Sequence, residues 1–189
     1  MNILVTGSNG QLGNEMRTLA SGSANRWLFT DVTVVEGVET IPLDITDKDA
    51  VESICSDYSI DCIVNCAAYT NVDKAEDEEK LAYRINAYAV GLLAEAAAAR
   101  GALLIHISTD YVFKGINVRP YIEDQPTDPL GVYGRTKLAG EKALCESGCR
   151  FIILRTAWLY SPYGNNFVKT IRRLTSERDS INVVFDQVG

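Results

Sequence analysis

Short apolar runs alternate with longer segments of helical periodicity along the chain. Strands that are buried on both faces of a parallel sheet have this uninterrupted apolar character, and the segments between them are long enough to hold crossover helices. The alternation predicts an α/β fold, a doubly wound and mostly parallel sheet of about seven strands with helices on both faces. The predicted strands are Asn2–Thr6, Trp27–Thr30, Thr40–Leu43, Asp61–Asn65, Leu103–Ser108, Phe151–Arg155 and Ile181–Phe185.

The segments between these strands carry helix signals at their ends. Thr46 is a suitable N-cap for one helix, and Gly101 is a suitable C-terminal glycine for an alanine-rich one. The segment Gly115–Gly131 contains three prolines and has no periodicity, which is typical of a functional or mobile loop. The predicted helices are Gln11–Ala20, Asp47–Tyr58, Glu76–Arg100, Val132–Glu146 and Asn166–Ser176.

The size and the end of the chain suggest one domain. There are 189 residues, of which 47% are hydrophobic, enough for one sizeable core. The sequence stops at residues 186–189, directly after the last predicted strand. We therefore expect residues 1–189 to form one domain from which a C-terminal lobe is largely absent; a natural stop at this point is the alternative.

Charge, cysteine content and the N-terminus exclude several classes of partner. The formal net charge is -7, which argues against a nucleic acid or an anionic membrane as partner. The first residues lack a basic flank, and no apolar run approaches the length of about 20 residues that a membrane span needs. The five cysteines are odd in number and form no CxxC pair, so we expect small buried side chains in a reducing compartment. These features predict a cytoplasmic protein without a metal site.

A glycine-rich turn follows the first predicted strand and opens the first predicted helix. Gly7, Gly10 and Gly13 are spaced G-x-x-G-x-x-G, and Gln11 and Leu12 begin the helix. Glycines at such a turn let backbone N–H groups approach a pyrophosphate, and the helix N-terminus adds positive dipole. The position at a strand–turn–helix junction predicts a Rossmann-type NAD(P)-binding domain, against the alternative of a chance glycine turn.

Three later strand ends supply further candidates for contact with the dinucleotide. Asp31 ends the second predicted strand, where a carboxylate can accept a hydrogen bond from a ribose 2′-OH and would repel a 2′-phosphate. On this residue alone NADH is favoured over NADPH, although an ordinary loop aspartate is an equal alternative. Ordinary turn residues are also the alternative for the other candidates, which are Asp44, Ile45, Ala67, Ala68 and Tyr69.

Tyr133 and Lys137 lie four residues apart at the start of a predicted helix, and so share one face. An ammonium group near a phenol favours the phenolate and lowers a pKa that is otherwise about 10. The YxxxK spacing often arises by chance, but the run Ser108-Thr109-Asp110 lies at the end of the fifth predicted strand upstream of it. A hydroxyl there can hydrogen-bond a substrate carbonyl and share its proton with the phenol. The combination predicts a catalytic site made of Tyr133, Lys137 and a hydroxyl at this strand end.

The residues around these positions resemble those of the extended short-chain dehydrogenase/reductases, and in particular the dTDP-4-dehydrorhamnose reductase family. The resemblance covers nearly the whole chain. It is carried by the runs Asn71–Glu76, Ser108–Phe113, Val132–Glu141, Arg155–Tyr160 and Gly164–Phe167.

The resemblance implies a role for each matching residue. Tyr133 would donate a proton to the C4 oxygen of a dTDP-4-keto-6-deoxy sugar as hydride arrives from NADPH or NADH. Lys137 would lower the pKa of Tyr133 and bind the nicotinamide ribose. Thr109 would polarise the C4 carbonyl, with Asp110 and Trp158 beside the sugar nucleotide. Asn86 would support the lysine. The single histidine, His106, is expected in the core.

The resemblance also implies that the sugar nucleotide lies between this domain and a C-terminal lobe, so we expect residues 1–189 to bind cofactor but to reduce substrate poorly. Related dehydratases carry Thr-Asp-Glu where this chain has Thr109, Asp110 and Tyr111, which favours simple reduction. Two alternatives stay open: a regulatory subunit similar to the beta subunit of methionine adenosyltransferase, and a reductase of another 4-keto deoxysugar nucleotide. A homodimer through the helix around Asn86–Ala99 is a further hypothesis.

Overall fold

A computed structural model describes residues 1–117 and 119–183. Within this part of the chain the fold is a six-stranded, entirely parallel sheet in the order β3-β2-β1-β4-β5-β6. The order reverses between β1 and β4, which makes this pair of strands the switch point of a doubly wound sheet. The strands are β1 (Asn2–Thr6), β2 (Arg26–Asp31), β3 (Ile41–Pro42), β4 (Cys62–Asn65), β5 (Leu103–Thr109) and β6 (Arg150–Thr156).

The predicted α/β class and parallel sheet are confirmed, with six strands where about seven were expected. The missing strand is Ile181–Phe185. Residues 181–183 have no regular structure, and residues 184–185 lie outside the described residues. Strand β6 is thus an edge of the described sheet, and its Phe151, Ile152 and Leu154 side chains are partly exposed.

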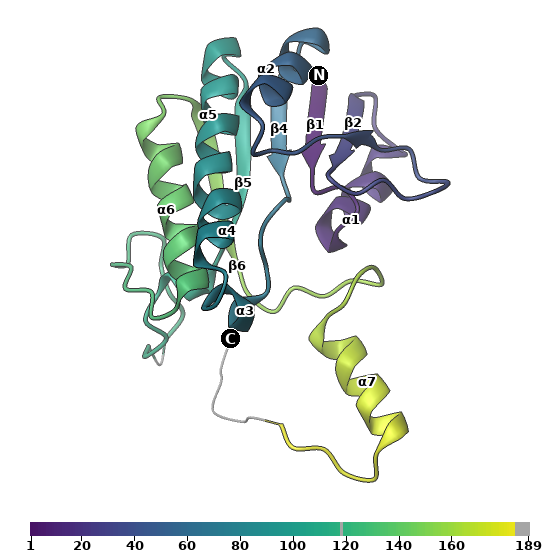
Figure 1. Ribbon diagram of the computed structural model, residues 1–189, viewed down its shortest axis with the longest axis vertical. Helices are drawn as coiled ribbons and strands as arrows, with labels where there is room; N and C mark the ends of the chain where they lie inside the picture. The colour runs from purple at the N-terminus through teal and green to yellow at the C-terminus, as the bar shows by residue number, and fades with distance from the viewer. Residues whose placement is uncertain (118, 184–189) are drawn as a thin grey trace.

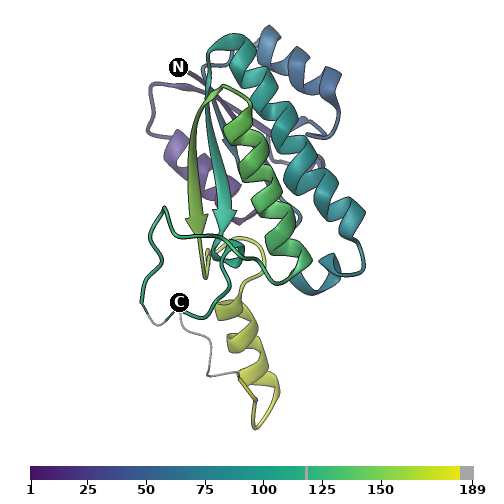
Figure 2. The ribbon, with the colours of Figure 1, turned by 90° about the vertical axis from the view of Figure 1, so that its left-hand side faces the viewer.

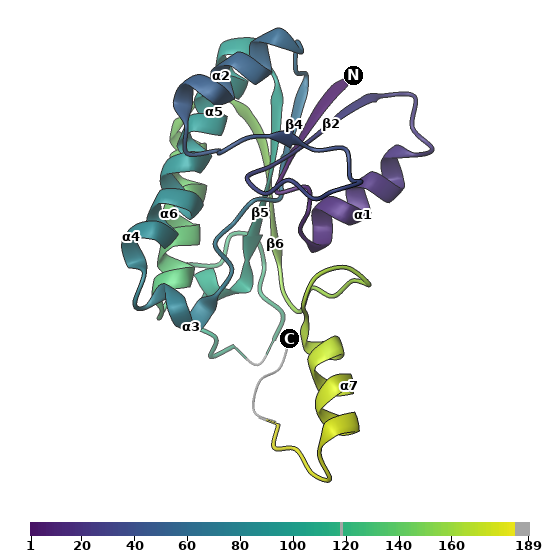
Figure 3. The same ribbon diagram turned by 45° about the vertical axis from the view of Figure 1, so that its right-hand side comes forward.

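Helices cover both faces of the sheet (Figures 1 and 3). Helix α1 (Gln11–Ala20) lies on one face. Helices α2 (Lys48–Asp57), α5 (Ala89–Arg100) and α6 (Val132–Glu146) cover the other face, where α5 and α6 run side by side (Figure 2). Asp47, and not Thr46 as predicted, caps α2, because its side chain accepts a hydrogen bond from the Ala50 N–H.

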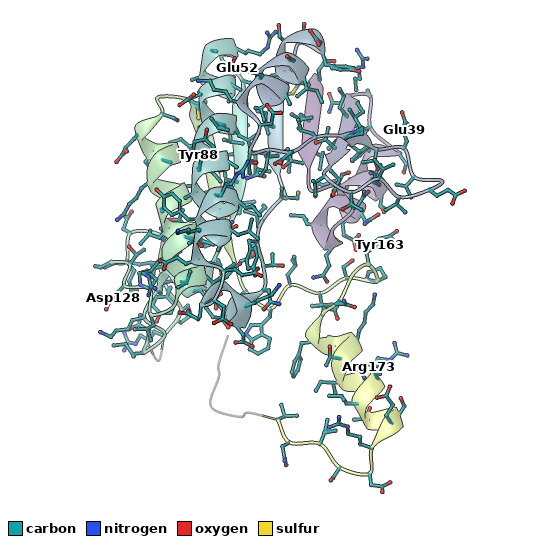
Figure 4. All side chains as sticks on the ribbon, viewed as in Figure 1. Glu39, Glu52, Tyr88, Asp128, Tyr163 and Arg173 are labelled. Atoms are coloured by element: carbon teal, nitrogen blue, oxygen red, sulfur yellow. The ribbon has the colours of Figure 1, made fainter. Side chains whose placement is uncertain are left out.

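The last helix, α7 (Phe167–Glu177), stands away from the sheet and has no buried residue. Figure 4 shows the Arg173 side chain projecting from it into solvent, where it pairs with Glu177 at 2.9 Å. The chain between β6 and α7 returns to α1, because Ser161 donates a hydrogen bond to Glu15 and Asn166 donates one to Gln11.

The helix predicted over Glu76–Arg100 is present from Glu79 to Arg100, but it is not a single regular α-helix. The structure has α3 (Val72–Ala75), α4 (Glu79–Tyr83) and a π-helical turn (Arg84–Tyr88) before α5. At the π-helical turn the carbonyl oxygen of Asn86 lies only 2.1 Å from where a Cβ on Gly140 of α6 would be. This close crossing of two helices depends on contacts between segments distant in sequence, which local periodicity does not reveal.

The main core lies between the sheet and the helices α2, α5 and α6, and includes Leu4, Ile63, Leu93 and Leu104, all fully buried. Four alanine side chains of α5, those of Ala89, Ala94, Ala96 and Ala97, pack into this core. All five cysteines are free thiols, and Cys145 is the exposed one. Across residues 1–117 and 119–183, no helix combines the length and the apolar character that a bilayer span requires.

Candidate active site

A cleft of about 710 Å³ opens at the carboxyl ends of β1, β4, β5 and β6. This is the edge at which open α/β sheets bind ligands. Most of the residues that the sequence nominated line it: Gly7, Gly10, Gln11, Leu12, Asp31, Asp44, Ile45, Ala67, Ala68, Thr109, Asp110, Tyr133, Lys137 and Trp158. Gly13 and Tyr69 do not line the cleft but support segments that do.

The glycine loop brings the backbone close to the cleft floor. Gly7 has φ +62°, and a Cβ there would lie 2.6 Å from the Cα of Ala67 at the end of β4. Helix α1 begins after Gly10 without a side-chain cap, so backbone N–H groups of its first turn are available to a ligand. Such N–H groups and the helix dipole attract phosphate, and a dinucleotide pyrophosphate fits this loop.

Gly13 allows α1 to pack against the loop that precedes it. A Cβ at this position would lie 2.4 Å from the Cα of Ser8 and 2.5 Å from the carbonyl oxygen of Gly7. We expect Gly13→Ala to destabilise the fold by about 3 kcal/mol and to weaken dinucleotide binding at least tenfold, because backbone must move to admit the methyl group. Urea unfolding and fluorescence titration with NADH and NADPH measure the two effects.

Gly22→Ala is the matched control, because nothing lies within 4 Å of a Cβ built there. It should leave dinucleotide affinity unchanged. Equal stability and equal dinucleotide affinity of the two variants would contradict the packing role of Gly13.

Asp31 shapes the loop as well as facing the cleft. Its carboxylate accepts hydrogen bonds from the backbone N–H groups of Asn9 at 3.0 Å and Thr33 at 2.9 Å. Asp44 in turn accepts from the N–H of Thr46 at 2.8 Å. Both carboxylates therefore fix the turns in which they lie, in addition to any contact with a ligand.

Tyr133 lies in the first turn of α6, next to Thr109 at the end of β5. Burial raises the pKa of the Tyr133 phenol, and a hydrogen bond with Thr109 opposes this effect in part. Lys137 was predicted to lower this pKa, but desolvation by burial dominates and the pKa is raised. The phenol is therefore protonated at neutral pH, which suits the donation of a proton.

Lys137 is almost completely buried, with 1% of its surface exposed, yet it borders the cleft. Its Nζ donates a hydrogen bond to the carbonyl oxygen of Ile107 at 2.7 Å. Burial lowers the pKa of this amine to about 8, while the nearby Glu141 carboxylate raises it. Keeping this amine charged beneath the cleft therefore lowers the free energy of unfolding.

We expect Lys137→Met to stabilise the fold by about 2 kcal/mol at neutral pH. The difference between the ordinary pKa of 10.5 and about 8 corresponds to about 3 kcal/mol, of which the lost hydrogen bond to Ile107 offsets about 1. At a pH between these two pKa values, the Lys137 amine is protonated in the unfolded chain and unprotonated in the folded chain. Stability of the native protein therefore rises from pH 8 to pH 10.5, and the advantage of the variant shrinks there.

Urea unfolding at neutral pH and at alkaline pH measures this advantage. Lys142→Met, at an exposed position of the same helix, controls for the change in net charge. A Lys137→Met chain that is less stable than the native protein at neutral pH would contradict the argument.

A buried ion pair supports Lys137 from one turn further along α6. Glu141 accepts two hydrogen bonds from Arg155 of β6, at 3.0 and 2.7 Å, and one from the hydroxyl of Ser108. The Glu141 side chain is 5% exposed and the Arg155 side chain 24%. The hydrogen bond to Glu141 raises the pKa of the Arg155 guanidinium, so the pair joins α6, β5 and β6 as charged groups.

Asn86 connects the other side of α6 to the end of β4. Its side-chain amide donates hydrogen bonds to the carbonyl of Tyr69 and to the hydroxyl of Thr136, and its oxygen accepts from the Tyr69 N–H. These direct bonds go to neighbours of the cleft and not to Lys137. They hold the loop after β4, which bears Ala67 and Ala68, against the helix that bears Tyr133.

Trp158 occupies an unusual backbone conformation at the mouth of the cleft. Its φ is +52°, which a bulky residue rarely adopts, and half of its side chain is exposed. The indole packs edge-on against Phe167 of α7, with ring centroids 5.6 Å apart. An aromatic ring held this way can contact a ligand that enters from this side.

The sequence did not nominate several residues that line the cleft. Tyr111 packs edge-on against Tyr133, and Gly164 and Asn165 come from the segment that returns to α1. Tyr111 follows Thr109 closely enough to be found by strand-end reasoning. Gly164 and Asn165 reach the cleft only because the chain folds back on Gln11, which no local pattern indicates.

The sheet order, the switch point between β1 and β4 and the glycine loop define a Rossmann-type α/β domain, the class that binds dinucleotides at the carboxyl ends of its strands. The family model described as "RmlD substrate binding domain" matches residues 1–189, and the chain belongs to this family.

Individual relatives agree with this assignment. The chain is 44% identical over 189 residues to the dTDP-4-dehydrorhamnose reductase of Escherichia coli (strain K12), covering all of this chain and 62% of the relative. A solved dTDP-4-dehydrorhamnose reductase from Clostridium acetobutylicum ATCC 824 is 43% identical with a TM-score of 0.93, covering all of this chain and 64% of that one. The enzyme of the same name from Bacillus anthracis str. Ames, solved in complex with NADP, is 40% identical with a TM-score of 0.85, covering 95% of this chain and 61% of that one. The chain thus spans less than two thirds of each relative.

Proposed function

We propose that the protein takes part in the reduction of dTDP-4-dehydro-6-deoxy-L-mannose to dTDP-L-rhamnose, with NADPH or NADH as hydride donor. The observation that carries the proposal is the placement of Thr109, Tyr133 and Lys137 on the wall of the cleft whose floor is the glycine loop. The names of the family members given above support the choice of substrate. Residues 1–189 act in this proposal as the NAD(P)-binding domain that carries the catalytic residues.

The bound nicotinamide supplies hydride to the C4 carbon of the sugar. Thr109 donates a hydrogen bond to the C4 carbonyl oxygen, which increases the positive charge on the carbon. Tyr133, protonated at neutral pH, gives its proton to the oxygen as the alkoxide forms. Lys137 stabilises the resulting phenolate and binds the hydroxyls of the nicotinamide ribose. Asp110 and Trp158 contact the sugar nucleotide.

Simple reduction is favoured over dehydration at this site. Elimination of water from the sugar requires a second base near the carbonyl, and the residue after Asp110 is Tyr111, whose ring packs against Tyr133. Among the described residues of the cleft, the position after Asp110 thus holds a phenol and not a second carboxylate beside the carbonyl.

Either nicotinamide coenzyme fits the proposal. The NADP complex of the Bacillus anthracis relative supports NADPH. The carboxylate of Asp31 supports NADH, although the two backbone N–H groups that it binds reduce its repulsion of a 2′-phosphate. In this proposal Asp31, Asp44 and Ile45 contact the adenosine half of the coenzyme.

The proposal is tested by assaying the protein with the 4-keto sugar nucleotide and each coenzyme. Consumption of NADPH or NADH, with dTDP-L-rhamnose identified as the product, is the expected result. Binding of a coenzyme without turnover of any 4-keto deoxysugar nucleotide, under conditions in which the Escherichia coli relative turns over, would sink the proposed activity.

Location and assembly are further parts of the proposal. We propose a cytoplasmic protein, because its substrates are charged nucleotides. A homodimer through α5 receives little support, since the alanine face of that helix packs into the core of its own chain. The exposed Leu81, Tyr83 and Tyr88 side chains on the outer side of α4 and the π-helical turn offer a better surface for a second copy. Light scattering measures the assembly state.

A further inference from the structure

One buried polar side chain next to the cleft has no part in the mechanism described above. His106 is the single histidine of the chain, lies in the middle of β5 and is fully buried, as the sequence predicted. It belongs to a line of side chains that crosses the sheet. The line runs from Thr6 of β1 through Asn65 of β4 to His106, and ends at Lys137 of α6.

The hydrogen bonds of this line fix which imidazole nitrogen carries the proton. The Thr6 hydroxyl donates to Asn65 Oδ1 at 2.6 Å, and Asn65 Nδ2 then faces His106 Nδ1 at 3.0 Å. An amide nitrogen only donates, so Nδ1 must accept and cannot carry hydrogen. Burial lowers the pKa of His106 well below its ordinary value, and the ring is neutral. Its one proton therefore sits on Nε2.

The opposite orientation of the Asn65 amide is disfavoured. In that orientation Asn65 Nδ2 would face Thr6. The hydrogen of the Thr6 hydroxyl would then lose Asn65 Oδ1, the acceptor that it has among the described residues. A buried donor without an acceptor costs about 1–3 kcal/mol. The Thr6 hydroxyl, one strand away, thus selects the tautomer of His106.

The consequence falls on Lys137. Its Nζ lies 3.5 Å from His106 Nε2. Both atoms carry hydrogen when the lysine is charged, so this contact offers the ammonium no acceptor. The carbonyl of Ile107 takes one of its three hydrogens. The only other charged group of the described residues near it, Glu141, is occupied by Arg155 and Ser108.

We propose that His106 is a positioning residue for Lys137: the Nε2–H denies Nζ a second internal acceptor and leaves two of its hydrogens for ligand hydroxyls in the cleft. The inference rests on the proposed function in taking that ligand to be the nicotinamide ribose. The fold could have used the histidine as an acceptor, which would draw the ammonium inward. The hydrogen-bond line from Thr6 prevents this.

The tautomer can be tested without any assay of activity. Because the chain has one histidine, the imidazole nitrogen resonances in a nitrogen-15 NMR spectrum need no assignment. Between about pH 6 and pH 8, we expect the pattern of a neutral ring protonated on Nε2, without titration. A ring protonated on Nδ1, or a ring that gains a second proton in this range, would overturn the inference.

The effect on Lys137 is tested with Asn65→Asp. A carboxylate accepts from Nδ1–H, which moves the bare nitrogen to Nε2, and Lys137 then gains a second internal acceptor. We expect NADH binding to weaken about tenfold, the loss of one hydrogen bond to a charged group. Thr6→Val keeps the shape of the side chain but lets the Asn65 amide adopt the opposite orientation. It should also weaken NADH binding, to a smaller degree.

ADP is the matched ligand, because it lacks only the nicotinamide and its ribose. Its affinity should change less than about twofold in both variants, whereas a general folding or charge defect weakens ADP and NADH alike. Equal losses for the two ligands, or no loss for NADH, would overturn the positioning role. A protein that reduces no sugar but shows the Nε2–H ring and the selective NADH loss would remove the proposed reaction and leave this inference intact.

Discussion

Tyr133→Phe is expected to reduce turnover of the 4-keto sugar at least about a thousandfold while leaving coenzyme affinity within about twofold of the native value. The substitution removes one hydroxyl from a ring that is packed against Tyr111, so the ring should keep its place. Without the phenol, the C4 oxygen loses its proposed proton donor, because Thr109 is proposed to polarise the carbonyl through a hydrogen bond and not to give up its proton. Steady-state kinetics and coenzyme titration measure the two quantities.

Tyr58→Phe is the control for the same chemical change elsewhere. Tyr58 lies at the other end of the sheet, where its carbonyl accepts from the Asn2 side chain and its ring stacks under Arg26. It should retain full turnover. A Tyr133→Phe protein with more than about a tenth of native turnover would show that another group supplies the proton.

Glu141→Leu is expected to destabilise the fold by about 3–5 kcal/mol, measured by urea unfolding. The substitution leaves the Arg155 guanidinium without its two carboxylate hydrogen bonds and the buried Ser108 hydroxyl without its acceptor. It also removes the carboxylate that raises the pKa of Lys137, so turnover should fall at neutral pH along with stability. Both losses follow from removing one partner of a buried pair.

Two controls separate the buried pair from charge in general. Glu52→Leu breaks an exposed ion pair with Lys48 on α2 and should lower the free energy of unfolding by less than about 1 kcal/mol. Figure 4 shows Glu52 at the opposite end of the molecule from α7. Arg155→Leu combined with Glu141→Leu leaves no charge without its partner and should recover part of the stability. If Glu141→Leu lowered the free energy of unfolding no more than Glu52→Leu does, the hydrogen bonds of Glu141 would not stabilise the fold.

The local sequence was sufficient for most strands of the sheet and for the floor of the cleft. A strand buried on both faces must be apolar throughout, so β1, β4 and β5 were found close to their true bounds. A glycine turn between a strand and a helix has few other uses, and Gly7 and Gly10 do line the cleft. These features are visible in sequence because their physical cause acts over a few neighbouring residues.

The protonation states and supports of the site were decided by tertiary structure. The spacing of Tyr133 and Lys137 predicted a shared face but not the desolvation that raises the pKa of one and lowers that of the other. The partners of Lys137, Glu141 and His106 come from β4, β5 and β6, which are distant in sequence. Burial and hydrogen bonding of this kind depend on which strands become neighbours, and periodicity along one segment carries no information about that.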